Sequence, residues 1–302
     1  INFIAPNLEN LDISNNDFFN ASIKAERKLN NFITVKLPSS TLRSLNIRGC
    51  FFGGIEQGIF VPFQELRTLR LDTSRGKYFY PDSSNTAGEL PLFYGGSGNT
   101  DHKLTTLSAR DNNFKSLGTT NLTTTPHEVN VENLNSLVNL DLYNNSNLIG
   151  TCNISSPDIK SINIGRTKLQ CPTTLQNAVN LETFSAVLNS NFGSLFFGSS
   201  EATYAFSGCN KLISLNLDRS SVSGYIPLFN NASLRNIDLL GCNNLIAGRP
   251  GESGTAKCLY NRTFENSPNV SFFRLTVNNT NFAGEIEPNT FVPLQNSLTY
   301  LQ

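Results

Sequence analysis

Apolar and polar residues follow one another in this chain in a pattern that keeps returning. An aliphatic or aromatic residue stands at one position, at the third position after it and at the fifth, and a small, mostly polar residue stands at the eighth. The two later apolar residues are two positions apart, so in an extended strand their side chains point to the same side, while the residue between them faces solvent. Each copy of the pattern therefore predicts one short strand with one buried face.

Ten copies of the pattern cover nearly the whole sequence, and their starts are 22 to 38 residues apart. The three apolar residues and the closing residue of each copy are Leu8, Leu11, Ile13, Asn16; Leu42, Leu45, Ile47, Cys50; Leu66, Leu69, Leu71, Ser74; Leu104, Leu107, Ala109, Asn112; Leu137, Leu140, Leu142, Asn145; Ile159, Ile162, Ile164, Thr167; Leu181, Phe184, Ala186, Asn189; Leu212, Leu215, Leu217, Ser220; Leu234, Ile237, Leu239, Cys242; and Val270, Phe273, Leu275, Asn278. A period of this size indicates a repeat protein whose stacked coils share one core.

The closing residue of each copy is Asn, Cys, Thr or Ser. It stands where the chain turns away from the strand, and a turn leaves backbone groups that need partners once they are buried. Asn suits this position because its amide carries both donors and an acceptor. We expect Cys50 and Cys242, which occupy the same position, to be buried free thiols rather than disulfide partners.

The pattern resembles the leucine-rich-repeat signature L-x-x-L-x-L-x-x-N/C-x-L over almost the whole chain. Val222, Gly224, Ile226 and Pro227 also match the x-L-x-G-x-I-P continuation of plant-type and bacterial or phage members, although most copies lack it. The resemblance implies an α/β-type repeat solenoid, a right-handed horseshoe or arc with a parallel β-sheet on one face and mostly irregular or short-helical returns. It also implies a recognition scaffold without catalysis.

We expect residues 1–302 to form a single solenoid of about ten coils that is a fragment of a longer chain. Leu298 and Leu301 begin an eleventh copy, and neither end shows the polar cap that solenoids normally need. Flanking domains or assembly partners are therefore expected to cap both ends. Longer insertions interrupt the pattern near residues 75–101, 114–133, 192–210 and 247–266.

Charge and hydropathy restrict the class of partner. Basic and acidic side chains number 23 each, so the chain lacks the basic excess that nucleic-acid binding normally requires. Its longest apolar stretches are only a few residues, too short for insertion into a membrane. The 42 asparagines and 56 serines and threonines fit either an AT-rich genome or an extracellular surface. We expect a protein or a cell-surface glycan as partner, and an extracellular, virion or cell-surface location.

Two groups of residues are candidates for ligand binding. Arg48, Arg70 and Arg110 stand at outward-facing strand positions of the second to fourth coils, with Tyr143 beside them, and Arg and Tyr are enriched at interface hot spots. The alternative is that such residues only keep an exposed sheet soluble. The second group is an aromatic loop tip in the first long insertion, which could bind a partner or fold back on the coil edge: Tyr78, Tyr80 and Tyr94.

The sequence offers little catalytic chemistry. The six cysteines include no C-x-x-C pair, and His102 and His127 are isolated, so we expect no metal or other cofactor. The pairing of Cys152 with Cys171, 19 residues apart on successive coils, stays open. Paired carboxylates could serve a glycosidase, and the one plausible couple is Asp218 with Asp238. A solvated surface pair is the simpler interpretation of those two residues.

Three functions follow from these features. The first is a non-enzymatic recognition or structural module of a larger extracellular assembly, such as a phage tail, a virion appendage or a microbial surface protein that attaches to a host. The second is the ectodomain of a eukaryotic receptor-like protein, which the motif at 222–227 and eight Asn-x-Ser/Thr sequons suggest and which a glycan at Asn231 or Asn261 would favour. The third, a polysaccharide-processing enzyme, depends on Asp218 and Asp238 alone.

Overall fold

The computed structural model describes residues 5–16, 37–50, 60, 62–73, 89–90, 102–112, 114, 116–118, 129–131, 134–154, 156–172, 175, 177–195, 204–249 and 256–302. The chain divides into two compact units, unit 1 (Ile1–Ile159) and unit 2 (Lys160–Gln302). Each unit is described by itself. The four predicted insertions lie partly or largely outside the described residues, and a single solenoid of about ten coils stays a prediction.

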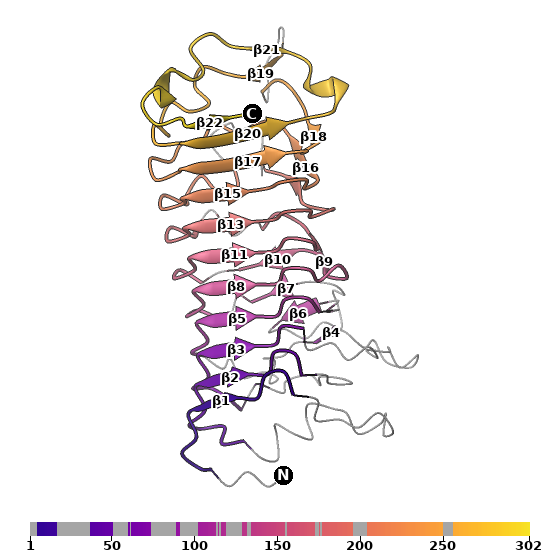
Figure 1. Ribbon diagram of the computed structural model, residues 1–302, viewed down its shortest axis with the longest axis vertical. Coiled ribbons are helices and arrows are strands. Elements are labelled where there is room, and N and C mark those ends of the chain that lie inside the picture. Colours follow the sequence, from indigo (N-terminus) through magenta and orange to yellow (C-terminus); the bar gives the residue numbers. More distant parts are fainter. Residues whose placement is uncertain are drawn as a thin grey trace. The chain divides into compact units, whose positions relative to one another are not determined.

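Every copy of the apolar pattern forms a strand, and these strands form the main parallel sheet of each unit (Figure 1). In unit 1 the order is β1 (Asn10–Asp12), β2 (Ser44–Asn46), β3 (Thr68–Arg70), β5 (Thr106–Ser108) and β8 (Asn139–Asp141). In unit 2 it is β11 (Ser161–Asn163), β13 (Thr183–Ser185), β15 (Ser214–Asn216), β17 (Asn236–Leu240), β20 (Phe272–Thr276) and β22 (Tyr300–Leu301). The predicted parallel sheet is confirmed, and β22 is the start of the eleventh copy.

The strands pair in the register that the repeat predicts. Leu45 lies opposite Leu69, which lies opposite Leu107 on the next strand. All three side chains are completely buried. Because equivalent residues stand side by side on neighbouring strands, the solvent-facing positions form continuous rows along each sheet. We call the residue between the two later apolar residues the middle position, and the residue after them the end position.

Short second strands occupy the returns, where the sequence predicts irregular or short-helical segments. In unit 1 they are β4 (Glu89–Leu90), β6 (Ser116–Gly118), β7 (Val129–Asn130), β9 (Ile149–Gly150) and β10 (Cys152–Asn153). In unit 2 they are β12 (Lys168–Leu169), β14 (Gly193–Ser194), β16 (Val222–Gly224), β18 (Asn244–Leu245), β19 (Lys257–Leu259) and β21 (Glu285–Ile286), with the 3-10 helices η3 (Thr280–Phe282) and η4 (Val292–Leu294).

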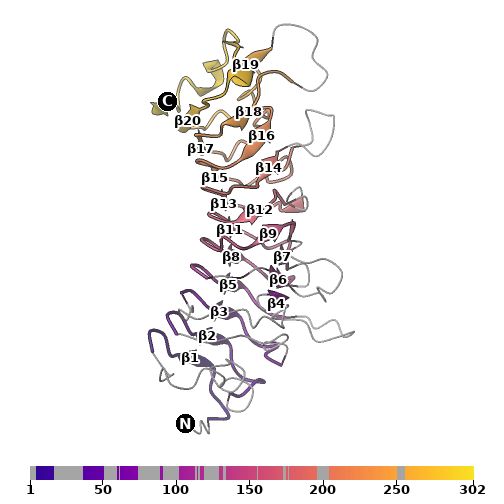
Figure 2. The ribbon, with the colours of Figure 1, turned by 90° about the vertical axis from the view of Figure 1, so that its right-hand side faces the viewer.

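The clearest x-L-x-G-x-I-P motif accounts for one of these second strands. Strand β16 begins at Val222 and ends at Gly224, and it pairs with β14 on one side and β18 on the other (Figure 2). Gly224 has φ +83°, a backbone conformation that glycine adopts without a steric penalty. The motif therefore marks a place where the return leaves the core and pairs with its neighbours.

Aromatic rings fill the core of unit 2. Phe184 packs against Phe206 with ring centroids 4.9 Å apart, and Phe264 packs against Phe273 at 5.0 Å. Phe206 and Phe264 both come from segments predicted as insertions, and both are almost completely buried. The described parts of these two insertions therefore contribute to the core rather than only to the surface.

The closing residues satisfy the backbone inside the turns. The amide nitrogen of Asn145 donates to the carbonyls of Leu142, in its own coil, and Ala109, in the preceding coil, both at 2.8 Å. Asn112 likewise reaches the carbonyl of Leu71 in the coil before it, at 2.9 Å. Asn112 and Asn145 are buried, as the sequence predicts. Since buried polar groups need partners, these side chains form a buried ladder that links their coils to the coils before them.

Thiols take the same place in two coils. Cys50 donates to the carbonyl of Ile13 at 3.0 Å, and Cys242 donates to that of Leu217 at 3.1 Å. Both cysteines are buried and free, which confirms the sequence prediction. Cys152 is also a free thiol, so the disulfide that its spacing from Cys171 allowed is not formed.

A second set of polar contacts lies three residues before the repeats that begin at Ile159 and Leu234. The Ser156 hydroxyl donates to the carbonyl of Leu137 at 2.7 Å, and the amide of Asn231 donates to that of Cys209 at 2.5 Å. Ser156 and Asn231 are both buried. Asn231 is therefore part of the internal framework of unit 2 and does not present a surface amide.

The chain adopts a left-handed conformation at one fixed position of the repeat, between the end position and the closing residue. We call this the left-handed position. Its φ values run from +48° to +67° in Asn15, Gly49, Thr73, Asp111, Asn144, Arg166, Leu188, Arg219 and Gly241. Glycine takes this conformation freely and Asn and Asp tolerate it, whereas for other L-residues it costs roughly 1–2 kcal/mol.

The buried ladder leads to a stability prediction for Asn145. Replacing Asn145 with Ala leaves the carbonyls of Leu142 and Ala109 without this donor, and we expect the free energy of unfolding to fall by about 2 kcal/mol. Urea unfolding measured by circular dichroism tests this value. The matched control is Asn147→Ala, at an exposed position of the same coil, which should change the free energy by less than about 0.5 kcal/mol. Equal effects of the two variants would contradict the ladder.

Candidate recognition surface

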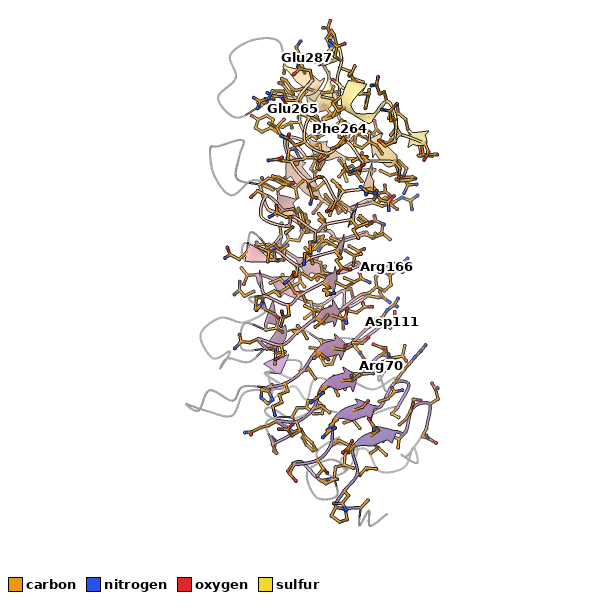
Figure 3. All side chains as sticks on the ribbon, turned by 90° about the vertical axis from the view of Figure 1, so that its left-hand side faces the viewer. Arg70, Asp111, Arg166, Phe264, Glu265 and Glu287 are labelled. Atoms are coloured by element: carbon orange, nitrogen blue, oxygen red, sulfur yellow. The ribbon has the colours of Figure 1, made fainter. Side chains whose placement is uncertain are left out.

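The exposed face of the main sheet in unit 1 carries the residues that the sequence nominates for binding. Arg70 occupies the middle position of its coil, and Arg48, Arg110 and Tyr143 occupy end positions. Strand pairing places Arg70 between Asn46 and Ser108. Figure 3 shows Arg70 on the same side of unit 1 as Asp111, which follows Arg110. The structure therefore brings the predicted residues onto one face.

Asn and Asp side chains at the middle positions shape the backbone of the main sheet in both units. Each of them accepts a hydrogen bond from the amide two residues later, at the end position. These pairs are Asp12 with Ser14 (2.9 Å), Asn46 with Arg48 (3.1 Å), Asp141 with Tyr143 (3.1 Å), Asn163 with Gly165 (3.2 Å), Asn216 with Asp218 (3.1 Å) and Asp238 with Leu240 (3.1 Å). The Asn and Asp residues of this row thus have a local structural role, whatever else they contact.

The backbone ladder continues past the strands and fixes the end positions. The amide of Gly49 donates to the carbonyl of Asp72 at 2.8 Å, and that of Thr73 donates to the carbonyl of Arg110 at 2.9 Å. The Asp72 carboxylate accepts from the Ser108 hydroxyl at 2.6 Å and from the Arg110 amide at 2.9 Å. The side chains at the end positions therefore start from a rigid framework.

Arg110, Asp141 and Tyr143 form one contact group. The guanidinium of Arg110 lies 5.1 Å from the centre of the Tyr143 ring, within the range of a cation–π interaction. Its Nε is 3.6 Å from Oδ2 of Asp141, which is too long for a hydrogen bond. Arg48 and Arg70 on the preceding coils are exposed. The face thus combines one partly immobilised guanidinium with two that extend into solvent.

Burial raises the pKa of Asp141 above its usual value. The Tyr143 amide and the Arg110 guanidinium favour the charged form, but nearby Asp72 and Asp111 oppose it. Asp12, at the same position of the first coil, shows the opposite shift, because hydrogen bonds from Ser14 and Asn46 lower its pKa. The pKa values of two carboxyl groups at the same position of the repeat are therefore shifted in opposite directions.

The raised pKa gives a pH-dependent prediction. Stability contributed by a carboxyl group whose pKa rises on folding is fully present below the unfolded pKa, near 3.9, and is lost as pH rises through the folded pKa. Asp141→Asn keeps an acceptor for the Tyr143 amide and should be more stable than the natural chain at pH 7, with the advantage shrinking near pH 3.5. The urea concentration at the midpoint of unfolding, compared between the variant and the natural chain at both pH values, measures this difference in stability.

Asp12→Asn is the control for this measurement. The lowered pKa of Asp12 means that its contribution is present at neutral pH and is lost as pH falls through the folded pKa, so the variant should be less stable than the natural chain at pH 7. A loss of stability in both variants at pH 7 would contradict the assignment for Asp141.

The predicted loop tip lies outside the described residues. Tyr78, Tyr80 and Tyr94 all belong to segments that are not described, so their proposed role in binding stays a prediction.

The carboxylates nominated for catalysis belong to an ion network in unit 2. Arg274 donates from Nε to Oδ1 of Asp238 at 2.9 Å and from Nη2 to Oδ2 of the same residue. Its Nη2 is also 3.9 Å from Oδ2 of Asp218. Both carboxylates therefore face the same guanidinium, and their use by a glycosidase stays a hypothesis.

The remaining chemistry is also limited. Burial raises the pKa of Cys152, Cys209 and Cys242 to about 12, whereas a nucleophilic cysteine needs a lowered pKa. Within the described residues, no three His, Cys, Asp or Glu side chains are grouped so that they could hold a metal ion. None of the helices in the described part of the chain has the length and hydropathy needed to cross a bilayer.

Unit 2 carries surface features that the sequence did not indicate. Phe272 and Tyr300 stack on neighbouring strands with ring centroids 4.8 Å apart. A hollow of about 410 Å³ is lined by Glu182, Lys211, Ile213, Ala232, Ser233 and Arg235. Arg166, Leu188 and Arg219 occupy the left-handed position in successive coils. A count of residue types at that position would have revealed the last group.

Comparison with known proteins supports the fold. No family model and no curated protein matches the sequence. The crystal structure of PEPR1-AtPEP1 matches with a TM-score of 0.55 at 20% identity, over 87% of this chain and 31% of that one, so this chain spans less than a third of its length. An internalin, InlF of Listeria monocytogenes strain 4b F2365, matches with a TM-score of 0.42 at 13% identity, over 98% of this chain and 86% of that one. The chain has a leucine-rich-repeat fold.

Proposed function

We propose that this chain is a non-enzymatic recognition module that binds a protein or a cell-surface glycan outside the cell through the sheet face of unit 1. The observation that carries the proposal is the set of side chains on that face. Arg48 and Arg70 extend into solvent beside Arg110, which lies over Tyr143. Arg and Tyr are enriched among the residues that dominate binding energy at interfaces.

The backbone of the face supports this role. The ladder bonds of Gly49 and Thr73 and the contacts of Asp72 fix the positions from which the three arginines extend. A surface whose backbone is ordered before binding loses less entropy when a partner docks. The repeat therefore supplies a rigid support, and the variable end positions supply specificity.

The setting we propose first is a larger extracellular assembly, such as a phage tail, a virion appendage or a microbial surface protein that attaches to a host or partner. The Asn-rich composition and the irregular repeat lengths support it. The alternative is the ectodomain of a eukaryotic receptor-like protein. The second strand formed at Val222–Gly224 and the likeness to PEPR1, crystallised with AtPEP1, support that alternative.

A binding experiment with charge-matched variants tests the sheet face. The labelled chain is applied to intact candidate host cells, a panel of purified ectodomains and a glycan panel, and Arg48, Arg70 and Arg110 are replaced together by Ala. Each lost hot-spot arginine typically costs more than 1 kcal/mol, so we expect saturable binding by the natural chain and at least a hundredfold weaker binding by the triple variant.

The control for this experiment removes the same number of positive charges from unit 1. Arg43, Arg67 and Lys103 are exposed and stand before the strands, away from the outward-facing positions, so their joint replacement by Ala should leave binding within threefold. Equal losses in both triple variants would indicate a nonspecific charge effect and overturn the proposed surface. Full binding by the Arg48, Arg70 and Arg110 variant would also overturn it.

Glycosylation distinguishes the two settings. The side chain of Asn261 is exposed, whereas Asn231 is buried with its amide bonded to the Cys209 carbonyl. Of the two sequons that would favour the receptor setting, Asn261 is therefore the informative one in the folded chain. A receptor ectodomain purified from its natural source should carry a glycan at Asn261 in peptide mass spectrometry. An unmodified Asn261 in that material would favour the microbial or viral setting.

A further inference from the structure

Unit 2 keeps large side chains at the backbone position that disfavours them most. Arg166, Leu188 and Arg219 occupy the left-handed position of three successive coils, with φ values of +50°, +57° and +51°. Neither Arg nor Leu suits this conformation, because its Cβ approaches the following carbonyl oxygen. Four of the five equivalent residues in unit 1 are Gly, Asn or Asp, which tolerate it: Asn15, Gly49, Asp111 and Asn144. Thr73 is the exception.

The ladder does not require these side chains. The amides of Arg166, Leu188 and Arg219 donate to carbonyls of the next coil at 2.7, 2.8 and 2.6 Å. Gly241, at the same position one coil later, makes the equivalent bond to Thr276 at 2.8 Å without a side chain. Asn or Gly would therefore complete the fold at a lower steric cost. Strain that persists without a structural need often marks a functional site.

The side chain of Arg219 is exposed. Its side chain is 64% exposed, and its Nε is 3.8 Å from Oδ1 of Asp218, too far for a hydrogen bond. A Cβ on Gly241 would come within 3.1 Å of Cγ of Arg219, so the glycine leaves room for the arginine stem. Arg166 is also exposed, and Figure 3 shows it at the outer edge of the strands.

Apolar side chains lie between and beside the two arginines. Val187 and Leu188 come from the coil between them, and Leu240 occupies the end position of the coil after Arg219. All three are only half-buried. The equivalent positions of unit 1 carry Ser14, Arg48, Asp72, Arg110 and Tyr143. Gly165, next to Val187, has no side chain, so nothing projects from the sheet face at that point. Arg166 and Arg219 are two strand spacings apart, roughly 10 Å.

We propose that Arg166, Leu188 and Arg219, together with Val187 and Leu240, form a docking surface for an extended acidic segment of a partner protein. The two guanidinium groups bind carboxylates, for which their planar donor pairs are well suited. An apolar side chain of the segment packs between them on Val187 and Leu188. The two arginines are roughly 10 Å apart and have apolar side chains between them, so a polypeptide with spaced carboxylates and an apolar residue between them fits better than the dense phosphates of a nucleic acid.

This surface lies on unit 2 and does not depend on the function proposed for unit 1. The proposal for one unit can be contradicted by its test without affecting the proposal for the other. The Arg48, Arg70 and Arg110 triple variant therefore serves as a control here, and it should bind an acidic probe at unit 2 as the natural chain does.

The experiment measures binding and stability in the same variants of the whole chain. The probe is a fluorescent twelve-residue peptide of three Asp-Leu-Asp-Ser repeats, followed by anisotropy. Two further peptides replace every Asp by Lys or every Leu by Ser. We expect saturable, salt-sensitive binding of the first peptide, no binding of the Lys peptide, and at least fivefold weaker binding of the Leu-free peptide.

The variants separate function from folding. Arg166→Asn with Arg219→Asn, and separately Leu188→Asn, should raise the urea midpoint, because each relieves a strained residue. The arginine pair should weaken binding of the acidic peptide at least tenfold. Thr73→Asn is the matched control, since it removes a strained residue from unit 1 and should raise the midpoint without changing binding.

Three results would overturn the proposal. The first is no binding of the acidic peptide by the natural chain, and the second is binding by the arginine pair variant as tight as that by Thr73→Asn. A lower urea midpoint in the unit 2 variants would show that these side chains stabilise the coils, and that the strained conformation is retained for the fold.

Discussion

The structure depends on one requirement, which is that the polar backbone of every turn must find partners inside an apolar stack. Leucine-like residues fill each coil, but the turn after each strand carries carbonyls that water cannot reach. Asn112 and Asn145 supply donors to these carbonyls, and Cys50 and Cys242 do so with a thiol. The closing residue is therefore restricted to a few small donors, while the exposed positions beside it remain variable. That separation makes one framework compatible with many surfaces.

The sequence predicted the framework because each of its residues reports on a short-range constraint. All ten copies of the pattern form strands in the predicted register, and the buried thiols Cys50 and Cys242 lie where the repeat put them. The short second strands were missed because they are two or three residues long and only the motif at Val222–Gly224 marks one of them. The burial of Asn231 was missed because a sequon gives no information on the contact its amide makes with Cys209.

The candidate surface was predictable in position but not in detail. Alternation along each strand shows that Arg48, Arg70 and Arg110 face outward, and the structure agrees. The contact of Arg110 with Tyr143 and the raised pKa of Asp141 depend on burial and on neighbouring coils, which alternation does not encode. The network of Arg274 with Asp238 likewise joins residues 36 positions apart. Electrostatic detail of this kind follows from the stacking of coils and not from any single repeat.

The buried ladder also has a direction. Asn112 and Asn145 each donate to a carbonyl of the coil before their own, as Cys50 and Cys242 do, so a coil receives its last internal hydrogen bond from its successor. A chain emerges from the ribosome with its N-terminal end first. The carbonyls of Ile13 and Ala109 already accept a bond from Asn16 and Asn112 of their own coils, and the following coil adds a second. These coils therefore complete their internal hydrogen bonds in the order in which the repeats are synthesised.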